Sequence, residues 1–230
     1  MLQAGYAITL TAARCGQPLT FTLDFSMTAI ATFNATSARA KALIALHASL
    51  SPAQIAAMPD PNDLLRSAIA LSIAGMDAYF TDRFSESLVR FLKKNGAKPD
   101  LISLLFGAGL DTKVALEMLT MQRPYRRVRT LVEGYLSNYT TQKQGVIDKL
   151  FLVYGVKGLC GHAEKHSKKK KLLTSVNGAV LRRHSIVHAG DLNAHNKPRP
   201  IDEKLATRYV TNVEVFVSNA EAMLGKALKI

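Results

Sequence analysis

One run of apolar residues most constrains the fold of this chain. Its members recur at spacings of three, four or seven positions, and they are Leu65, Ile69, Met76, Phe80, Phe84, Leu88 and Phe91. Such spacing places them on one stripe of an α-helix that faces a core. Asn62 can cap this helix, and Gly96 can stop it just after Lys94. The pattern therefore predicts a long helix over about residues 62–94.

Helical signals continue along most of the chain. They predict helices over about residues 27–50, 99–106, 111–119, 126–138, 140–154, 172–189 and from 202 onward. Asp111, Thr140 or Thr141, and Asp202 can cap three of these helices. We therefore expect an all-α fold with one principal core.

The N-terminal region differs from the rest. Leu19, Phe21, Leu23 and Phe25 alternate with polar residues and predict one side of a short strand over residues 18–25. A lone strand has no partner in a helical chain, so we expect either an arm that packs on the body or on another subunit, or a disordered segment. We divide the chain into an N-terminal extension, 1–55, with this strand and an Ala-rich helix, and a helical domain, 56–230.

Composition indicates a cytoplasmic protein. No stretch reaches the roughly 20 charge-free apolar residues that span a bilayer. No Lys or Arg precedes the apolar run within Met1–Cys15, so a secretory signal is not expected. Cys15 and Cys160 are too few for a disulfide framework and fit a reducing compartment. We expect no membrane partner.

Positive charge is concentrated after residue 70. The net charge is +13, but residues 1–70 hold four basic and three acidic residues, so the remainder carries +12. Such a field favours a polyanion, because neutralising phosphates releases condensed counterions. Nucleic acid is the first expectation, an anionic membrane surface the second, and a solvated surface tuned for solubility the plain alternative.

Arg183 and His188 form the constellation that carries chemistry. They are five positions apart, so a straight helix points them about 140° apart. They can meet if the last turn unwinds before Gly190, or if a two-fold axis brings in a second copy. An imidazole exchanges protons near neutral pH, and a guanidinium can donate hydrogen bonds to two oxygens of one phosphate. RNA supplies its own 2′-hydroxyl nucleophile, so these groups can replace a metal.

The segment around this pair resembles the signature of the HEPN superfamily. It runs Leu181-Arg182-Arg183-His184-Ser185-Ile186-Val187-His188-Ala189-Gly190-Asp191. The helix containing Gly75-Met76-Asp77-Ala78-Tyr79-Phe80-Thr81-Asp82-Arg83-Phe84 looks like the first core helix of the RiboL-PSP-HEPN branch. The resemblance covers roughly residues 60–228.

That resemblance implies an up-and-down helical bundle that dimerises into one composite endoribonuclease site. Arg183 would hold the scissile phosphate, His188 would be the catalytic histidine, and His184 would be the polar residue after the Arg, where Asn or Asp is commoner. No metal or other cofactor is implied. HEPN nucleases often act as toxins or in defence, so an inhibitory antitoxin-like protein is a further expected partner.

Several charged residues can assist this site. The expected RNA contacts are Lys168, Lys169, Lys170, Lys171, Arg182, Lys197 and Arg199. A lysine run is also commonly a solvated face. Asp77 can orient the catalytic Arg or His, although an exposed salt bridge is as consistent with its position. A second basic cluster, Arg123, Arg126, Arg127 and Arg129, surrounds Tyr125, which can stack a base. An ordinary solvated surface is the favoured interpretation of this cluster.

Two other functions fit the same residues. His184 and His188 lie four apart, and Cys160, His162 and His166 form a compact group, so both are candidate metal ligands. A zincin helix needs Glu after its first His, where this chain has Ser185. The second alternative is a non-catalytic module that binds nucleic acid or protein through the basic surface.

Overall fold

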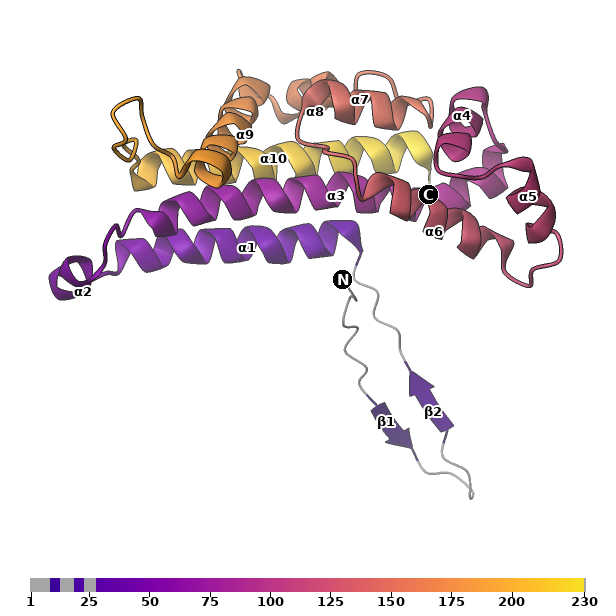
Figure 1. The fold of residues 1–230 in the computed structure, drawn as a ribbon, viewed down its shortest axis with the longest axis horizontal. Coiled ribbons are helices and arrows are strands. Elements are labelled where there is room, and N and C mark those ends of the chain that lie inside the picture. The colour runs from indigo at the N-terminus through magenta and orange to yellow at the C-terminus, as the bar shows by residue number, and fades with distance from the viewer. Residues whose placement is uncertain (1–8, 13–18, 23–27, 230) are drawn as a thin grey trace.

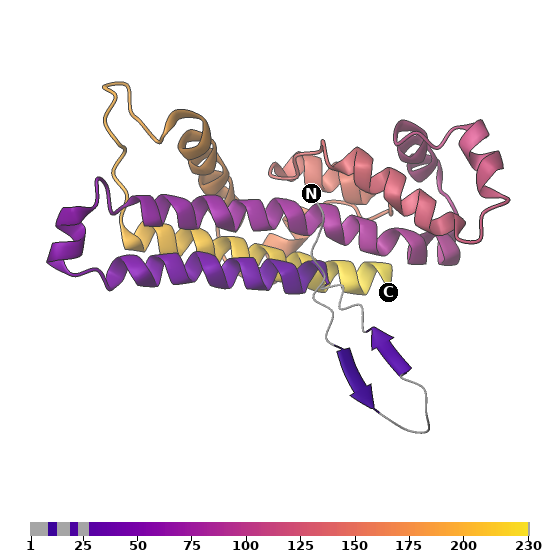
Figure 2. The same cartoon turned by 60° about the horizontal axis from the view of Figure 1, so that its bottom comes forward.

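Three long helices form the frame of the protein. The computed structural model describes residues 9–12, 19–22 and 28–229, and this part of the chain contains ten helices and two short strands. The long helices α1 (Ala29–Ala48), α3 (Asp63–Asn95) and α10 (Glu203–Leu228) lie side by side (Figures 1 and 2). The expected helical fold class is confirmed.

The direction of these helices follows from their contacts. Arg83 Nε donates to Glu221 Oε2 at 2.7 Å, and farther along, Lys94 Nζ donates to the Lys229 carbonyl at 3.3 Å. These two contacts show that α3 and α10 run in the same direction. The helix α1 runs against α3 and approaches it closely at Gly75, where an added Cβ would lie 2.9 Å from Thr36 Cγ2.

Shorter helices cover this frame. They are α2 (Pro52–Ala57), α4 (Pro99–Gly107), α5 (Thr112–Met118), α6 (Pro124–Leu136), α7 (Gln144–Leu152), α8 (Leu159–Ser167) and α9 (Leu172–Ala189). In Figure 1, α7, α8 and α9 lie on one side of α10, while α4, α5 and α6 gather toward the end of α3. The helices α8 and α9 both pack on α10. The HEPN-type arrangement of the bundle stays a prediction.

The core is built on the predicted stripe of α3. All seven of its apolar residues are buried. Phe84 stacks on Tyr154 with ring centroids 4.4 Å apart, and the Tyr154 hydroxyl donates to the Phe84 carbonyl at 2.8 Å. Phe80 packs against Phe151 and Phe216, which joins α3 to α7 and α10. The 3.6-residue period therefore predicted the central helix correctly.

Helix ends confirm some predicted caps and correct others. The side chains of Asp111 and Asp202 accept from backbone amides at the start of α5 and α10, as predicted. Asn62 makes no side-chain cap bond, so the cap predicted there is wrong; its backbone N–H donates to Asp60 Oδ1 at 3.0 Å. The cap predicted at Thr140 or Thr141 is wrong, since α7 begins at Gln144 and Thr141 binds Asp77.

Two helices were not predicted from the sequence. Pro52 stands at the first position of α2, where a backbone N–H would have no acceptor within the helix, so proline costs no hydrogen bond there. Ser51 forms a capping box with Gln54. The helix α8 begins just after Gly158; Gly155, Gly158 and Gly161 favour loose backbone in this region, so the sequence predicted no helix here. Its buried residues Leu159, Cys160 and Ala163 pack into the core, so tertiary contacts stabilise it.

The predicted strand has a partner. The strands β1 (Thr9–Ala12) and β2 (Leu19–Thr22) pair antiparallel, with Thr9 opposite Thr22, so the prediction of a lone strand is wrong. Leu23 and Phe25 of the predicted strand, like Cys15, lie outside the described residues. The role of this segment as an arm stays a prediction.

The proposed boundary at residue 55 also stays a prediction. The helix α1 falls in the predicted extension, yet its Phe33 is buried in the main core beside Tyr79. Across the described ranges, no helix is both long and apolar enough to cross a bilayer.

Candidate active site at the end of α9

The motif occupies the last turns of α9. The helix continues through His188 to Ala189, and Gly190 ends it with φ 58°. The amides of Gly190 and Asp191 both donate to the Ser185 carbonyl, the latter at 3.0 Å. The predicted stop at Gly190 is confirmed, and the unwinding before it that would join the motif pair within one chain does not occur.

Arg183 and His188 are therefore not brought together in a single chain. On this regular helix they point about 140° apart, and no hydrogen bond joins them. Arg183 is half-buried, and its guanidinium has no hydrogen-bond or ion-pair partner in the part of the chain that the structure describes. Two ways of bringing Arg183 and His188 together were predicted. Because the last turn does not unwind, pairing with a second copy across a two-fold axis is the one consistent with this geometry.

His184 and His188 do lie together. Their ring centroids are 4.5 Å apart, with an angle of 46° between the ring planes. Both side chains are exposed. Among residues 28–229, neither ring has a hydrogen-bond partner. Two imidazoles on one accessible surface can take up and release protons, which is the chemistry predicted for this segment.

Two exposed apolar side chains share the last turns of α9 with these imidazoles. Leu181 is 62% exposed and Val187 is 52% exposed. Ile186, between them in sequence, turns the other way and packs against Leu65, Ile69 and Ala206. The end of α9 is thus anchored on one side and presents an apolar and imidazole-rich surface on the other.

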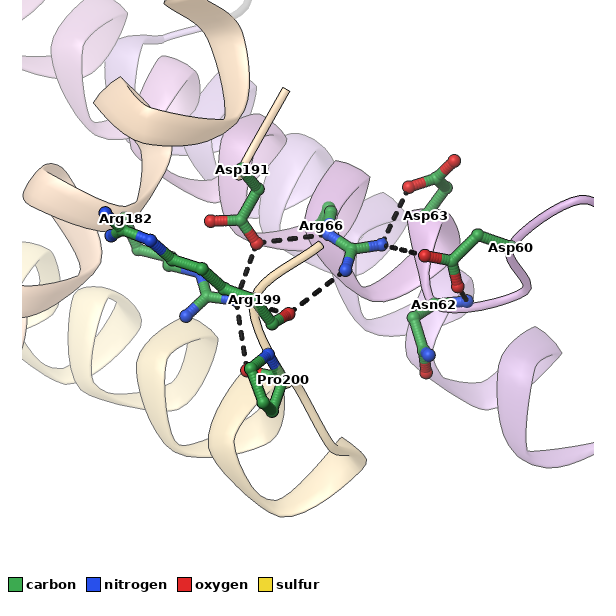
Figure 3. A network of polar contacts seen from close by, with 8 residues as sticks. All are labelled: Asp60, Asn62, Asp63, Arg66, Arg182, Asp191, Arg199 and Pro200. Carbon is green, nitrogen blue, oxygen red and sulfur yellow. Dashed lines mark hydrogen bonds and ion pairs between the residues drawn. The ribbon is translucent and has the colours of Figure 1, made fainter. Parts of the chain in front are cut away.

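A buried network holds the segment that follows the motif (Figure 3). Asp191 is fully buried, and its Oδ2 accepts from Arg182 Nη2 at 2.6 Å and from Arg66 Nε at 3.1 Å. Arg182 also donates to the carbonyls of Arg199 and Pro200. The network therefore ties the end of α9 and the 190–202 loop to the start of α3.

Arg182 is consequently not the RNA contact that the sequence predicted. Its side chain is only 14% exposed and is occupied by Asp191 and two carbonyls. Moving it to a phosphate would leave the buried Asp191 carboxylate with one partner fewer. The structure instead assigns Arg182 to holding the loop.

Arg66 completes this network and was missed by the sequence reasoning. Its Nη1 donates to Asp60 at 2.7 Å and to Asp63 at 2.9 Å, and its Nη2 donates to the Arg199 carbonyl at 3.1 Å. One sequence feature could have indicated a paired arginine here: Arg66 follows Leu65 of the buried stripe, and Asp63 lies three positions before it. Its link to Asp191 spans 125 positions, which no local pattern indicates.

Acid is expected to weaken this network through Asp60. Burial raises the pKa of the Asp60 carboxyl, but hydrogen bonds from Arg66 and from the Asn62 amide outweigh this and hold it below its ordinary value of 3.8. A group with a depressed folded pKa stabilises the fold above its unfolded pKa and loses that contribution as the pH falls through the folded pKa.

Asp60→Asn should therefore lower the free energy of unfolding at about pH 6 and have a smaller effect below about pH 4. Urea unfolding of both proteins at a series of pH values measures the difference. A difference that stays constant from about pH 6 to about pH 2 would contradict the role of this carboxylate.

The remaining predicted RNA contacts are all exposed. They are Lys168, Lys169, Lys170, Lys171, Lys197 and Arg199. No hydrogen bond or ion pair engages their side-chain nitrogens within the described ranges. The loop that carries Arg199 is nevertheless held by its backbone, since the Arg199 amide donates to the Asp191 carbonyl at 2.8 Å. These cations are accessible, and their role in RNA binding stays a prediction.

Asp77 does not reach the motif. Its Oδ1 accepts from the amide and hydroxyl of Thr141 at 2.6 and 2.7 Å, and its Oδ2 accepts from Gln142 Nε2 at 2.9 Å. Nothing in the described structure joins it to Arg183 or His188. Asp77 instead fixes the segment before α7 against α3.

The candidate metal ligands of α8 do not form a shared site. Cys160 is buried, where burial and the neighbouring Asp148 raise the pKa of its thiol. His162 is exposed, and His166 lies 2.7 Å from Asn219 Oδ1. Residues 28–229 contain no group of three His, Cys, Asp or Glu side chains with the geometry of a metal site.

Comparison of the chain with models of protein families, with curated proteins and with solved structures finds no match.

Proposed function

We propose that this protein is an endoribonuclease that cleaves RNA at the end of α9 without needing a metal ion. The observation that carries the proposal is the pair of exposed imidazoles, His184 and His188, which lie 4.5 Å apart. Arg183 directly precedes them, and no described residue engages its guanidinium. The resemblance of this segment to the HEPN signature and the excess of positive charge support the proposal.

The chemistry needs only these groups and the substrate. A neutral imidazole takes the proton of the RNA 2′-hydroxyl, and the 2′-oxygen attacks the adjacent phosphorus. The bond from phosphorus to the 5′-oxygen breaks, and a protonated imidazole donates to that oxygen. A guanidinium stabilises the charge that develops on the phosphoryl oxygens. The products are a 2′,3′-cyclic phosphate and a free 5′-hydroxyl.

We propose that two copies assemble the complete site. Arg183 and His188 diverge on one helix, so a two-fold axis along the exposed surface of α9 would bring Arg183 of one copy toward the imidazoles of the other. Leu181 and Val187 are exposed beside the histidines and would be covered in such a dimer.

A non-catalytic nucleic-acid-binding module is the second candidate. The observation that favours it is the separation of Arg183 from His188 on a regular helix. This function predicts RNA binding without cleavage and little effect of His188→Ala beyond local packing.

Cleavage of a mixed RNA pool in excess chelator tests the proposal. We expect fragments with 2′,3′-cyclic phosphate and 5′-hydroxyl ends. The rate should pass through a maximum with pH, because one imidazole must be neutral while the other is protonated. End mapping and a pH profile of the initial rate measure both. Fragments with 3′-hydroxyl ends, or activity that chelator abolishes and Mg²⁺ restores, would contradict this mechanism.

A further inference from the structure

A shallow, open surface depression of about 530 Å³ lies along the first turns of α10. Its lining consists of Lys169, Glu203, Lys204, Thr207, Arg208 and Thr211. Five of these six residues lie on one face of α10, because Lys204 and Arg208, like Thr207 and Thr211, are one helical turn apart. Lys169 comes from the turn between α8 and α9. We call this depression the α10 groove.

The α10 groove is cationic. Lys169, Lys204 and Arg208 are exposed, and within residues 28–229 none of their side chains makes an ion pair. The Arg208 guanidinium lies 5.6 Å from the centre of the Tyr209 ring, which limits its motion. Glu203 is the one carboxylate in the lining, and it lies 2.8 Å from His47 Nδ1. Three cations without anionic partners in the described chain thus line one depression, with two threonine hydroxyls between them.

The groove also has a defined position relative to the motif. Ser175 Oγ accepts from Asn212 Nδ2 at 2.6 Å, Gly178 faces Tyr209, and Ile186 packs on Ala206, so later residues of α9 meet earlier residues of α10. The start of α10 therefore lies at the same end of the molecule as His188. Lys204 marks the end of the groove nearer to the motif, and Lys169 lies toward the opposite end.

We propose that the α10 groove binds the phosphodiester backbone of RNA, with Lys169, Lys204 and Arg208 on the phosphates and Thr207 and Thr211 as hydroxyl donors. The role of this groove in guiding RNA to the end of α9 rests on the proposed function. RNA binding in the groove does not require cleavage. The lining holds three cations and one carboxylate, and that carboxylate lies beside His47, so the surface carries a net positive charge that favours a phosphate backbone over a protein surface. Such contacts carry no base specificity.

A pair of charge-reversal variants tests this site. Lys204→Glu/Arg208→Glu removes two groove cations, and Arg126→Glu/Arg127→Glu changes the net charge equally on the exposed surface of α6. Both pairs are made in full-length chain carrying His188→Ala, which prevents cleavage if the proposed function holds. Binding of a fluorescein-labelled single-stranded RNA is followed by anisotropy at several salt concentrations, and circular dichroism confirms that each variant folds.

We expect the groove pair to weaken RNA binding by at least about tenfold, and by several times more than the α6 pair. The slope of log Kd against log salt should fall by roughly 0.7 for each phosphate that the variant no longer neutralises. Equal weakening in the two pairs would show that only the overall field matters and would overturn the site. Unchanged RNA binding by the groove pair, or no RNA binding by any of the proteins, would also overturn it. Binding to phosphatidylserine vesicles is measured in parallel, and a groove pair that loses vesicle binding but keeps RNA binding would overturn it too.

The result separates this site from the proposed function. If the wild-type protein binds RNA through the groove but does not cleave it, the groove stands and the nuclease proposal fails. If the wild-type protein cleaves RNA and the groove pair binds it normally, the groove fails and the nuclease proposal stands.

Discussion

Replacing His188 by alanine is expected to lower RNA cleavage by roughly 10²–10⁴-fold, because the reaction loses a proton-transfer group. Arg183→Ala should lower it by roughly 10²–10³-fold, because the charge developing on the phosphoryl oxygens loses its cation. Initial cleavage rates in chelator measure both effects. His162→Ala is the matched control, since His162 is exposed on α8, which packs on the later part of α10, whereas the motif lies beside the start of α10. Its rate should equal that of the wild type. Unchanged cleavage in both motif variants would refute the assignment.

Mixing the two inactive variants tests whether the site is shared between copies. In a mixed dimer, His188 remains on the copy carrying Arg183→Ala, and Arg183 remains on the other. Two-fold symmetry gives two Arg183–His188 pairs across the interface, and one of these pairs is then complete. Because half of randomly mixed dimers have this composition, about a quarter of wild-type activity should return. A site formed within one chain would give no recovery, since each chain lacks one group.

Removing the buried carboxylate of Asp191 is expected to have the largest effect on stability. Asp191 is fully buried and accepts from both Arg66 and Arg182. Asp191→Ala would leave two guanidinium groups facing each other without the charge between them, which destabilises by about 3–5 kcal/mol. For a chain of this size the melting temperature should fall by roughly 6–20 °C. Differential scanning calorimetry or urea unfolding measures the effect.

Asp63→Asn is the matched control for this network. Asp63 also accepts from Arg66, but its side chain is 70% exposed. A solvent-exposed ion pair contributes about 0–1 kcal/mol, so this variant should unfold close to the wild type. Equal destabilisation by the two substitutions would show that burial of Asp191 between two arginines adds nothing to the free energy of unfolding beyond an exposed ion pair.

Local patterns predicted the elements whose causes are local. The stripe from Leu65 to Phe91 predicted α3, and Gly96 and Gly190 predicted helix ends, because each signal depends on residues within one or two turns. The helix α8 was missed, since its glycines indicate loose backbone while burial of Leu159 and Cys160 stabilises it. The start of α7 was misplaced because Thr141, a suitable cap by type, binds Asp77 instead.

The motif at the end of α9 followed the same division. The sequence alone determined that Arg183, His184 and His188 share the last turns of one helix, because helical spacing and the Gly190 stop are set by neighbouring residues. Only the tertiary structure decided which charged groups are occupied: Arg182 is held by Asp191, and Asp77 by Thr141 and Gln142. The physical reason is that an arginine or a carboxylate can pair with any opposite group that the fold brings near, and chain spacing does not specify which one.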